Sequence, residues 1–225
     1  MRNYTVNRMQ TEPLSQTDGA FDAVVLAGGR AARLGGSSKP DVLVAGRRLL
    51  DHALDAAAGA RRTVVVGPAG LATEPVLSAQ EDPPHGGPVA GVEAGLAALD
   101  RAADDAGEPR APLVLLLACD VPLARHVVVH LLAVADAAVA DGLDGAQVVD
   151  SGGRPQPLLG VYRRGLLTDA VAGLAARGGT RDAAIRRLLA DAHLREVRDV
   201  VGHAADADTW DDVRRLDDLL GDQRR

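Results

Sequence analysis

The sequence has little of several residue types on which particular functions depend. It contains one cysteine, Cys119, and one lysine, Lys39, and aromatic residues make up 2% of the chain. A single cysteine cannot form an internal disulfide, and scarce aromatic residues leave almost no platforms on which nucleic-acid bases could stack. The net charge of -6 provides no basic field for nucleic acid or anionic lipid. We therefore expect partners other than nucleic acids and membranes.

Long hydrophobic runs are also missing. No segment offers about 18 uninterrupted apolar residues, and residues 1–20 contain no apolar stretch like the core of a secretory signal. We expect a soluble, cytoplasmic protein. Residues 1–20 are expected to be a flexible leader or an extended start site, and residues 21–220 to be one domain built on a single core.

Hydrophobic periodicity predicts strands that alternate with helices. Short apolar or β-branched runs predict strands, and apolar residues at helical spacing predict helices. The expected strands are 21–26, 63–66, 112–118, 146–149, 158–162 and 194–197, and the expected helices are 48–60, 89–99, 127–140, 166–177, 181–190 and 210–220. Thr180 and Thr209 are expected to cap the last two helices. The pattern indicates an α/β fold with a three-layer α/β/α Rossmann-like sheet, mostly parallel with an antiparallel addition.

A glycine-rich, basic loop follows the first expected strand. It reads AGGRAARLGGSSK from Ala27 and ends at Lys39. Open α/β sheets bind ligands beyond the carboxyl ends of their strands, and glycine backbone N–H groups can face anionic oxygens. The loop matches neither G-x-x-x-x-G-K-[ST] nor G-x-G-x-x-G, which argues against a P-loop ATPase and an ordinary dinucleotide dehydrogenase. We interpret it as a polyphosphate cradle rather than a turn with surface arginines.

Two later segments also carry chemistry. Residues 81–91, EDPPHGGPVAG, join an acidic turn to the start of a helix, a position at which proline is tolerated. Asp120 ends an apolar strand, where it could hold Mg²⁺ together with phosphate oxygens or could cap the next helix. His126 and His130 have a spacing that can ligate zinc but lack a third ligand, and Cys119 lacks an adjacent histidine that would activate it.

The loop pattern L-A-G-G-x-x-x-R-x-G followed by a lysine resembles the signature of the nucleotidyltransferase superfamily that includes molybdenum cofactor guanylyltransferase. The matching residues are Leu26, Ala27, Gly28, Gly29, Arg33, Gly35 and Lys39. The resemblance implies that the loop wraps a triphosphate and that Lys39 and Arg33 steady the phosphates and the leaving pyrophosphate.

The same resemblance extends to the later segments. G-P-V-A-G resembles a segment of the family that lies against the nucleobase and ribose, which implies nucleotide contacts for Asp82, Gly87 and Pro88. It also implies that Asp120 binds the nucleotide and is the Mg²⁺ ligand. The implied reaction is transfer of GMP from GTP to Mo-molybdopterin with release of pyrophosphate, followed by transient contact with the enzyme that receives the cofactor.

The acceptor side of the resemblance is less complete. Residues 153–162, GRPQPLLGVY, resemble the family's acceptor side, and a turn with an edge strand explains them equally well. Asp206 to Thr209, DADT, stand where the family often has Asn-x-Asn-Thr-Pro, so the threonine matches and the asparagines do not. An enzyme that uses CTP or another triphosphate with another phosphorylated acceptor therefore stays open. A nucleotide-binding domain without turnover is a third alternative, against which the presence of both Lys39 and Asp120 argues.

Overall fold

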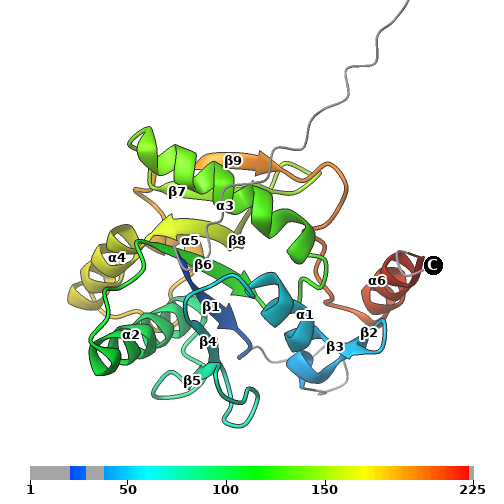
Figure 1. Ribbon diagram of the computed structural model, residues 1–225, viewed down its shortest axis with the longest axis horizontal. Coiled ribbons are helices and arrows are strands. Elements are labelled where there is room, and N and C mark those ends of the chain that lie inside the picture. The colour runs from blue at the N-terminus through cyan, green and yellow to red at the C-terminus, as the bar shows by residue number, and fades with distance from the viewer. Residues whose placement is uncertain (1–20, 29–37, 223–225) are drawn as a thin grey trace, which may run out of the picture.

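The computed structural model describes residues 21–28 and 38–222, which build a mixed sheet covered by helices (Figure 1). The seven-stranded sheet has the order β5-β4-β1-β6-β8-β7-β9. Its strands are β1 (Phe21–Leu26), β4 (Thr63–Val66), β5 (Leu77–Ala79), β6 (Leu113–Ala118), β7 (Gly145–Val149), β8 (Pro155–Arg163) and β9 (Arg195–Arg198). Strand β8 pairs antiparallel with β6 and β7, whereas the other neighbouring pairs in this sheet are parallel.

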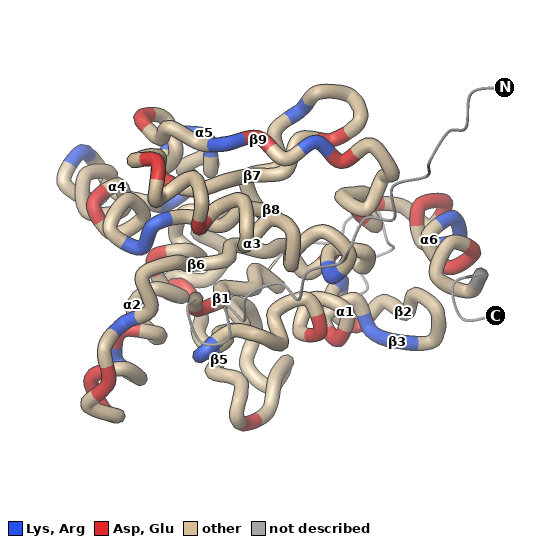
Figure 2. Tube along the Cα trace, turned by 45° about the horizontal axis from the view of Figure 1, so that its top comes forward, with Lys and Arg blue, Asp and Glu red and all other residues tan. Residues whose placement is uncertain are grey.

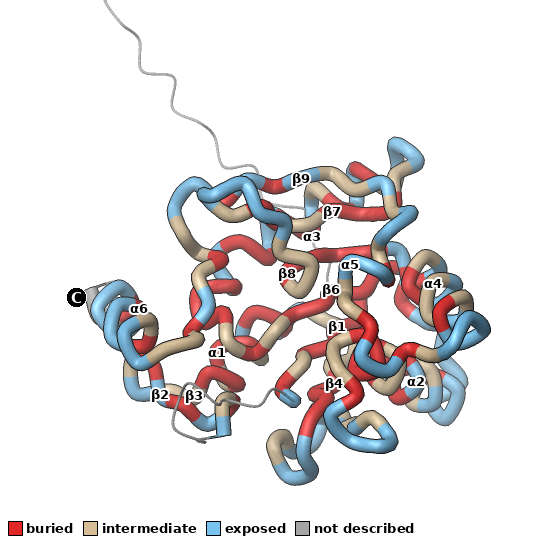
Figure 3. The backbone as a smooth tube through the Cα atoms, turned by 180° about the vertical axis from the view of Figure 1, so that it is seen from behind, coloured by how far each residue is buried: buried red, intermediate tan, exposed pale blue. Residues whose placement is uncertain are grey.

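Helices cover both faces of the sheet. One face packs against α1 (Leu49–Ala56) and α3 (Arg125–Ala140), and the other against α2 (Pro88–Ala106), α4 (Arg164–Ala176) and the short α5 (Ile185–Leu188). Successive strand residues point to opposite faces, so Ala23 and Val25 join the first core while Val24 joins the second. Buried positions follow the sheet (Figure 3). The expected three-layer, mostly parallel fold is confirmed.

Helix α2 approaches the sheet closely because it carries glycines on its inner side. A methyl group at Gly95 would lie 2.7 Å from Val24 Cγ1, and one at Gly91 would lie 3.0 Å from Leu26 Cδ2. Side chains at these positions would push the helix away from β1. The close contact therefore fixes the start of α2 at the carboxyl end of β1.

A third, smaller core lies at the side of the sheet. It joins the 3-10 turn η2 (Lys39–Asp41), the hairpin of β2 (Leu43–Val44) and β3 (Arg47–Arg48), and the final helix α6 (Trp210–Asp222), which lie together in Figure 1. Thr209 caps α6 as expected: its Oγ1 accepts the Asp212 N–H at 3.2 Å, and Asp212 Oδ2 accepts the Thr209 N–H at 3.0 Å. This packing brings Lys39 close to the segment that precedes α6.

Three helix predictions are wrong in extent. The helix expected over 89–99 is longer than expected and runs over Pro88–Ala106. The helix expected over 181–190 covers only Ile185–Leu188, and the first helix ends at Ala56 rather than at residue 60. Asp182 has a φ of 55°, a left-handed conformation that a right-handed helix does not admit, and its N–H donates to Gly86 O at 2.7 Å. Thr180 is not a helix cap, because its hydroxyl donates to Glu93 of α2.

Strand β5 and the β2–β3 hairpin were not predicted. Both are too short to show hydrophobic periodicity. Residues 1–20 lie outside the described residues, so the division into a leader and one domain stays a prediction. Basic and acidic positions are interspersed along the described chain, with several acidic positions on α6 (Figure 2). Among the helices of residues 21–28 and 38–222, none is long and apolar enough to cross a membrane.

Candidate active site

A cleft of about 300 Å³ opens at the carboxyl ends of β1, β4 and β6. This is the edge of an open α/β sheet at which ligands are expected. The lining residues are Leu26, Gly28, Lys39, Val66, Glu81, Gly87, Pro88, Gly91, Ala118, Cys119, Asp120 and Leu158. Gly87, with a φ of 86°, precedes Pro88 in the first turn of α2, so backbone and small residues form the wall on that side.

The ammonium of Lys39 lies between two carboxylates. Its Nζ is 2.6 Å from Asp120 Oδ2 and 2.5 Å from Asp208 Oδ1. Burial alone would lower the pKa of Lys39, but the attraction of Asp120 and Asp208 is larger in sum and raises the pKa above its usual value. The lysine is therefore charged throughout the physiological pH range. The helix-capping alternative for Asp120 is wrong, because α3 begins only at Arg125 with Ala124 before it.

Asp199 shapes the segment that carries Asp208. Its carboxylate accepts backbone N–H groups from the loop at 3.2, 2.9 and 2.6 Å, donated by Val201, Gly202 and Ala204. Burial opposes the charged form, but these hydrogen bonds outweigh it and hold the pKa of Asp199 below its usual value. The ionised side chain therefore fixes the turn by which the chain leaves β9.

One backbone hydrogen bond then joins this segment to β6. The Ala207 N–H donates to the carbonyl oxygen of Asp120 at 2.9 Å, and Ala207 itself is buried. The bond places Asp206 and Asp208 on either side of a fixed point beside Asp120. Desolvation, followed by the charges of Asp208 and Asp120, raises the pKa of Asp206, and Lys39 opposes this. Three aspartates and one lysine thus gather at the edge of the cleft.

The donor set suits a magnesium ion that is also bound by substrate. Within the described ranges no three His, Cys, Asp or Glu side chains are grouped to hold a metal ion on their own. Asp120 and Asp208 nevertheless flank one position for a positive charge, which the Lys39 ammonium fills. Mg²⁺ in proteins is held by one or two carboxylates, with phosphate oxygens and water as the remaining ligands. The residues present fit such an ion.

A second hollow of about 200 Å³ adjoins the cleft. The two share Ala118, Asp120 and Leu158 in their walls. The other lining residues of the hollow are Val121, Gln156, Pro157, Leu159, Ile185, Ala204 and Asp206. Asp120 therefore stands where the two spaces meet.

The structure brings together most, but not all, of the predicted site residues. Those that line the cleft are Leu26, Gly28, Lys39, Gly87, Pro88 and Asp120. Ala27 is buried behind it, with its N–H bonded to Val66 O at 2.8 Å. Gly29, Arg33 and Gly35 lie outside the described residues.

The acidic wall of the cleft comes from Glu81 rather than from Asp82. Glu81 lines the cleft and accepts the His85 N–H at 3.0 Å, whereas Asp82 lines a neighbouring hollow beside α2. The sequence shows two adjacent carboxylates, and only the path of the backbone after β5 decides which one faces Gly28. Asp208 was also missed as a site residue, because its contact with Lys39 depends on the packing of α6.

Cys119 lines the cleft without being a nucleophile. Burial, and then the nearby charge of Asp120, raises the pKa of its thiol to about 12. The thiolate that a nucleophilic role requires is therefore scarce at neutral pH. This agrees with the absence of an activating histidine in the sequence around it.

The open sheet, the cleft at its carboxyl edge and the lysine between aspartates define a class of proteins that bind phosphorylated nucleotides. The family model of the MobA-like NTP transferase domain matches residues 23–198. A molybdenum cofactor guanylyltransferase of Bradyrhizobium sp. (strain ORS 278) is 35% identical over 154 residues, which cover 66% of this chain and 68% of the relative. The chain therefore belongs to the MobA-like NTP transferase family and is a nucleotidyltransferase.

Two solved structures share the fold. Molybdopterin-guanine dinucleotide biosynthesis protein A from Archaeoglobus fulgidus has a TM-score of 0.61 at 19% identity, with 89% of this chain and 99% of that chain covered. The 2-C-methyl-D-erythritol 4-phosphate cytidylyltransferase from Thermus thermophilus has a TM-score of 0.57 at 21% identity, with 88% and 97% covered. At this identity the likeness concerns the fold alone.

Proposed function

We propose that the protein transfers GMP from GTP to Mo-molybdopterin and releases pyrophosphate. The observation that carries the proposal is the Lys39–Asp120 pair, which stands at the junction of the cleft and the second hollow. A phosphate lysine beside a metal carboxylate serves group transfer, and two spaces that meet there suit a donor and an acceptor. The choice of GTP and Mo-molybdopterin is supported by relatives named molybdenum cofactor guanylyltransferase.

In this reaction an oxygen of the acceptor phosphate attacks the α-phosphorus of GTP. A new P–O bond forms while the bond from the α-phosphorus to the oxygen that leads to the β-phosphorus breaks, and pyrophosphate leaves with that electron pair. Such transfer depends on positioning and on neutralisation of charge rather than on a covalent enzyme nucleophile. The protonated, buried Cys119 is consistent with this requirement.

Different residues of the chain would contact the triphosphate and the nucleoside of GTP. Lys39 neutralises phosphate charge after leaving its carboxylate partners, and Arg33 assists it. Backbone groups of the loop at Gly28, Gly29 and Gly35 would surround the triphosphate next to Leu26, and Ala27 would support the loop from behind. Gly87, Pro88 and Glu81 form the wall for ribose and base, a role in which Glu81 replaces the expected Asp82.

Asp120, with Asp208 beside it, would hold the metal ion. Bound Mg²⁺ would supply charge neutralisation on the reacting phosphoryl oxygens. Asp120 suits this role because it lies two residues after the buried strand β6, and its carbonyl oxygen accepts the Ala207 N–H, so its position is fixed from both sides. As part of this proposal the reaction would take place in the cytoplasm, and its product would pass to a cofactor-receiving enzyme by transient contact.

A related CTP-dependent transfer to another phosphorylated acceptor is the second candidate. One observation favours it: aspartates stand at positions 206 and 208, where the guanylyltransferase-like pattern often has asparagines. The donor test incubates the purified full chain and Mg²⁺ with Mo-molybdopterin and GTP, CTP, ATP or UTP in turn, and measures pyrophosphate. Release with GTP supports the first proposal, release with CTP alone supports CTP as the donor, and no release with any of the four triphosphates contradicts the first proposal.

A further inference from the structure

The hollow beside Asp120 differs in character from the nucleotide cleft. Most of its wall is apolar, formed by side chains of β8, α5 and the residue after Asp120: Val121, Pro157, Leu158, Leu159 and Ile185. Its volume of about 200 Å³ lies below the roughly 300–1,000 Å³ of pockets that enclose whole drug-sized ligands. The hollow is therefore suited to one flat ring of a larger molecule.

Apart from Asp120, the polar groups of this wall are Asp206 and Gln156. The amide of Gln156 is oriented by Asp150, whose Oδ2 accepts its Nε2–H at 2.9 Å. A carboxylate can only accept hydrogen bonds, so the amide nitrogen must face Asp150, and Oε1 is left as an acceptor. Asp150 is itself held by the N–H groups of Gly152 and Arg154, each at 2.9 Å from Oδ1.

Both polar groups thus offer acceptors to an occupant. In the part of the chain that the structure describes, no Lys or Arg contributes to the wall of the hollow. A phosphate or another anion placed there would lie against the carboxylates of Asp120 and Asp206, and the Lys39 ammonium beside them is already paired with Asp120. Binding of an anion there is therefore costly. A ring with N–H donors would satisfy the acceptors, while its faces would lie against the apolar side chains.

We infer that Asp206, supported by Gln156, selects an acceptor whose uncharged ring presents two adjacent N–H donors, as a 2-amino-4-oxopyrimidine ring does. The ring occupies the hollow, and the acceptor's phosphate extends toward Asp120, where the cleft begins. A carboxylate pairs with two adjacent donors through both oxygens, whereas the asparagine typical of the family would offer one acceptor and one donor. The identification of the hollow with the acceptor side rests on the proposed function.

Binding of isolated rings tests the inference without any transfer reaction. Pterin, 2-amino-4-oxopteridine, carries the two adjacent donors, and lumazine, pteridine-2,4-dione, replaces the amino group with a carbonyl. Each is titrated into the full chain without nucleotide, with intrinsic ring fluorescence as the readout. We expect the wild type to bind pterin at least about tenfold more tightly than lumazine.

Asp206→Asn should reduce this preference to within about threefold, because the amide can pair with the N–H and carbonyl of lumazine. Gln156→Leu should weaken binding of both rings. It is the second variant if Asp206→Asn unfolds at a clearly lower temperature than the wild type. Asp218→Asn, a change at an exposed residue of α6 that does not line the hollow, should leave the preference unchanged and is the matched control.

Equal affinity of the wild type for the two rings, no binding of either, or an unchanged preference in Asp206→Asn would overturn the inference. The donor test for the proposed function gives a separate answer. If pyrophosphate is released and Asp206→Asn keeps the wild-type preference for pterin, the proposed function stands and the role of Asp206 is wrong. If the preference for pterin depends on Asp206 but no pyrophosphate is released, the role of Asp206 stands and the proposed function fails.

Discussion

Lys39 Nζ lies 2.5 Å from Asp208 Oδ1, a residue 169 positions later in the chain. Together with Asp120, Asp208 neutralises the lysine that we propose for phosphate binding. Binding of a triphosphate must therefore exchange carboxylate partners of Lys39 for phosphate oxygens. The carboxylates released by this exchange become available to a metal ion.

Asp208→Asn should strengthen the binding of GTP in magnesium-free buffer by about threefold to tenfold. The substitution removes a negative charge next to the phosphates and weakens the interaction that holds Lys39 at Asp208. Calorimetric titration of the full chain checks this, with Asp218→Asn as the control. Weaker GTP binding in Asp208→Asn would show that Asp208 supports the nucleotide rather than competing with it.

Lys39→Ala should reduce turnover by about 100-fold or more, because a cation opposite the phosphates is lost. Thermal unfolding should show the fold retained, since Lys39 lies in a short turn at the edge of the sheet. Lys39→Arg keeps the charge on a planar fork and should recover part of the activity. Activity of Lys39→Ala within about threefold of the wild type would contradict the assigned role.

Asp120→Asn should abolish the Mg²⁺-dependent activity, because an amide is a poorer ligand for this ion than a carboxylate. The check is a titration of pyrophosphate release against Mg²⁺ concentration. Asp218→Asn should retain the wild-type curve. An Asp120→Asn curve that overlays the wild type would exclude Asp120 as the metal ligand.

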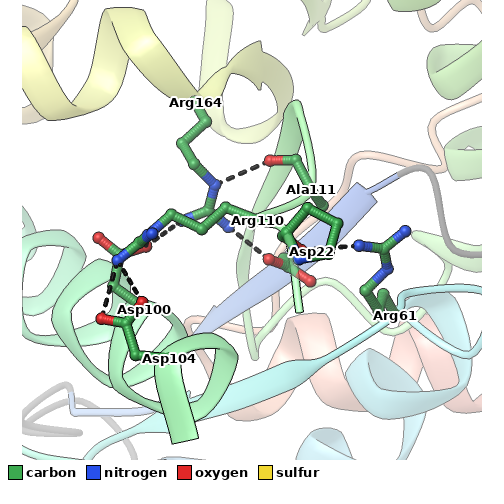
Figure 4. A network of polar contacts seen from close by, with 8 residues as sticks. Asp22, Arg61, Asp100, Asp104, Arg110, Ala111 and Arg164 are labelled. Carbon is green, nitrogen blue, oxygen red and sulfur yellow. Dashed lines mark hydrogen bonds and ion pairs between the residues drawn. The ribbon is translucent and has the colours of Figure 1, made fainter. Parts of the chain in front are cut away.

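A buried ion network at the opposite end of β1 gives a prediction about stability. Arg164 donates to Ala111 O and Asp100 Oδ1, each at 2.8 Å, and to Asp22, whose Oδ1 has no partner in the described structure (Figure 4). Burial raises the pKa of Asp22, and Arg164 opposes this. Arg164→Met should lower the free energy of unfolding by about 3–5 kcal/mol, because it leaves a buried carboxylate without its cation.

The double variant Asp22→Leu/Arg164→Met should recover much of that loss in urea unfolding, since neither charge remains buried. Arg195→Met removes an exposed ion pair with Asp141 and should cost less than about 1 kcal/mol. If Arg164→Met lowers the free energy of unfolding by no more than Arg195→Met does, the network does not stabilise the fold in the way described.

Asp199 predicts a pH dependence of stability. Its pKa in the folded protein is below the usual value of 3.8, so its ionised form stabilises the protein above that value, and the contribution is lost as the pH falls through the folded pKa. Asp199→Asn should lower the free energy of unfolding at neutral pH by about 2 kcal/mol. The difference from the wild type should vanish in strong acid, and a difference independent of pH would contradict this origin.

The sequence predicts the central strands well because their residues are buried on both faces. Phe21–Leu26 and Thr63–Val66 have the predicted bounds, since an uninterrupted apolar run admits few other places. The helix predicted over 181–190 is wrong at its start because Asp182 adopts a left-handed φ of 55°. Its N–H donates to Gly86 O, a contact that only the folded chain brings within reach.

Some residues of the candidate site could likewise be predicted from the sequence, and others could not. Lys39 ends the glycine-rich loop after β1, and Asp120 comes shortly after β6. Their place at the carboxyl edge of the sheet could therefore be predicted from the sequence. Asp208 reaches Lys39 only through the packing of α6 on the hairpin, and no local pattern encodes that contact. Glu81 and Asp82 are neighbours in the sequence, and the path of the chain after β5 separates their roles.

Transfer of label from the α-phosphate of GTP tests the central claim most directly. The full chain is incubated with Mg²⁺, Mo-molybdopterin and GTP labelled at the α-phosphorus, and the products are separated. The account predicts label in a dinucleotide formed with the acceptor, unlabelled pyrophosphate in equal amount, and loss of both products in Lys39→Ala. Label that stays in GDP, or pyrophosphate release that does not depend on the acceptor, would contradict it.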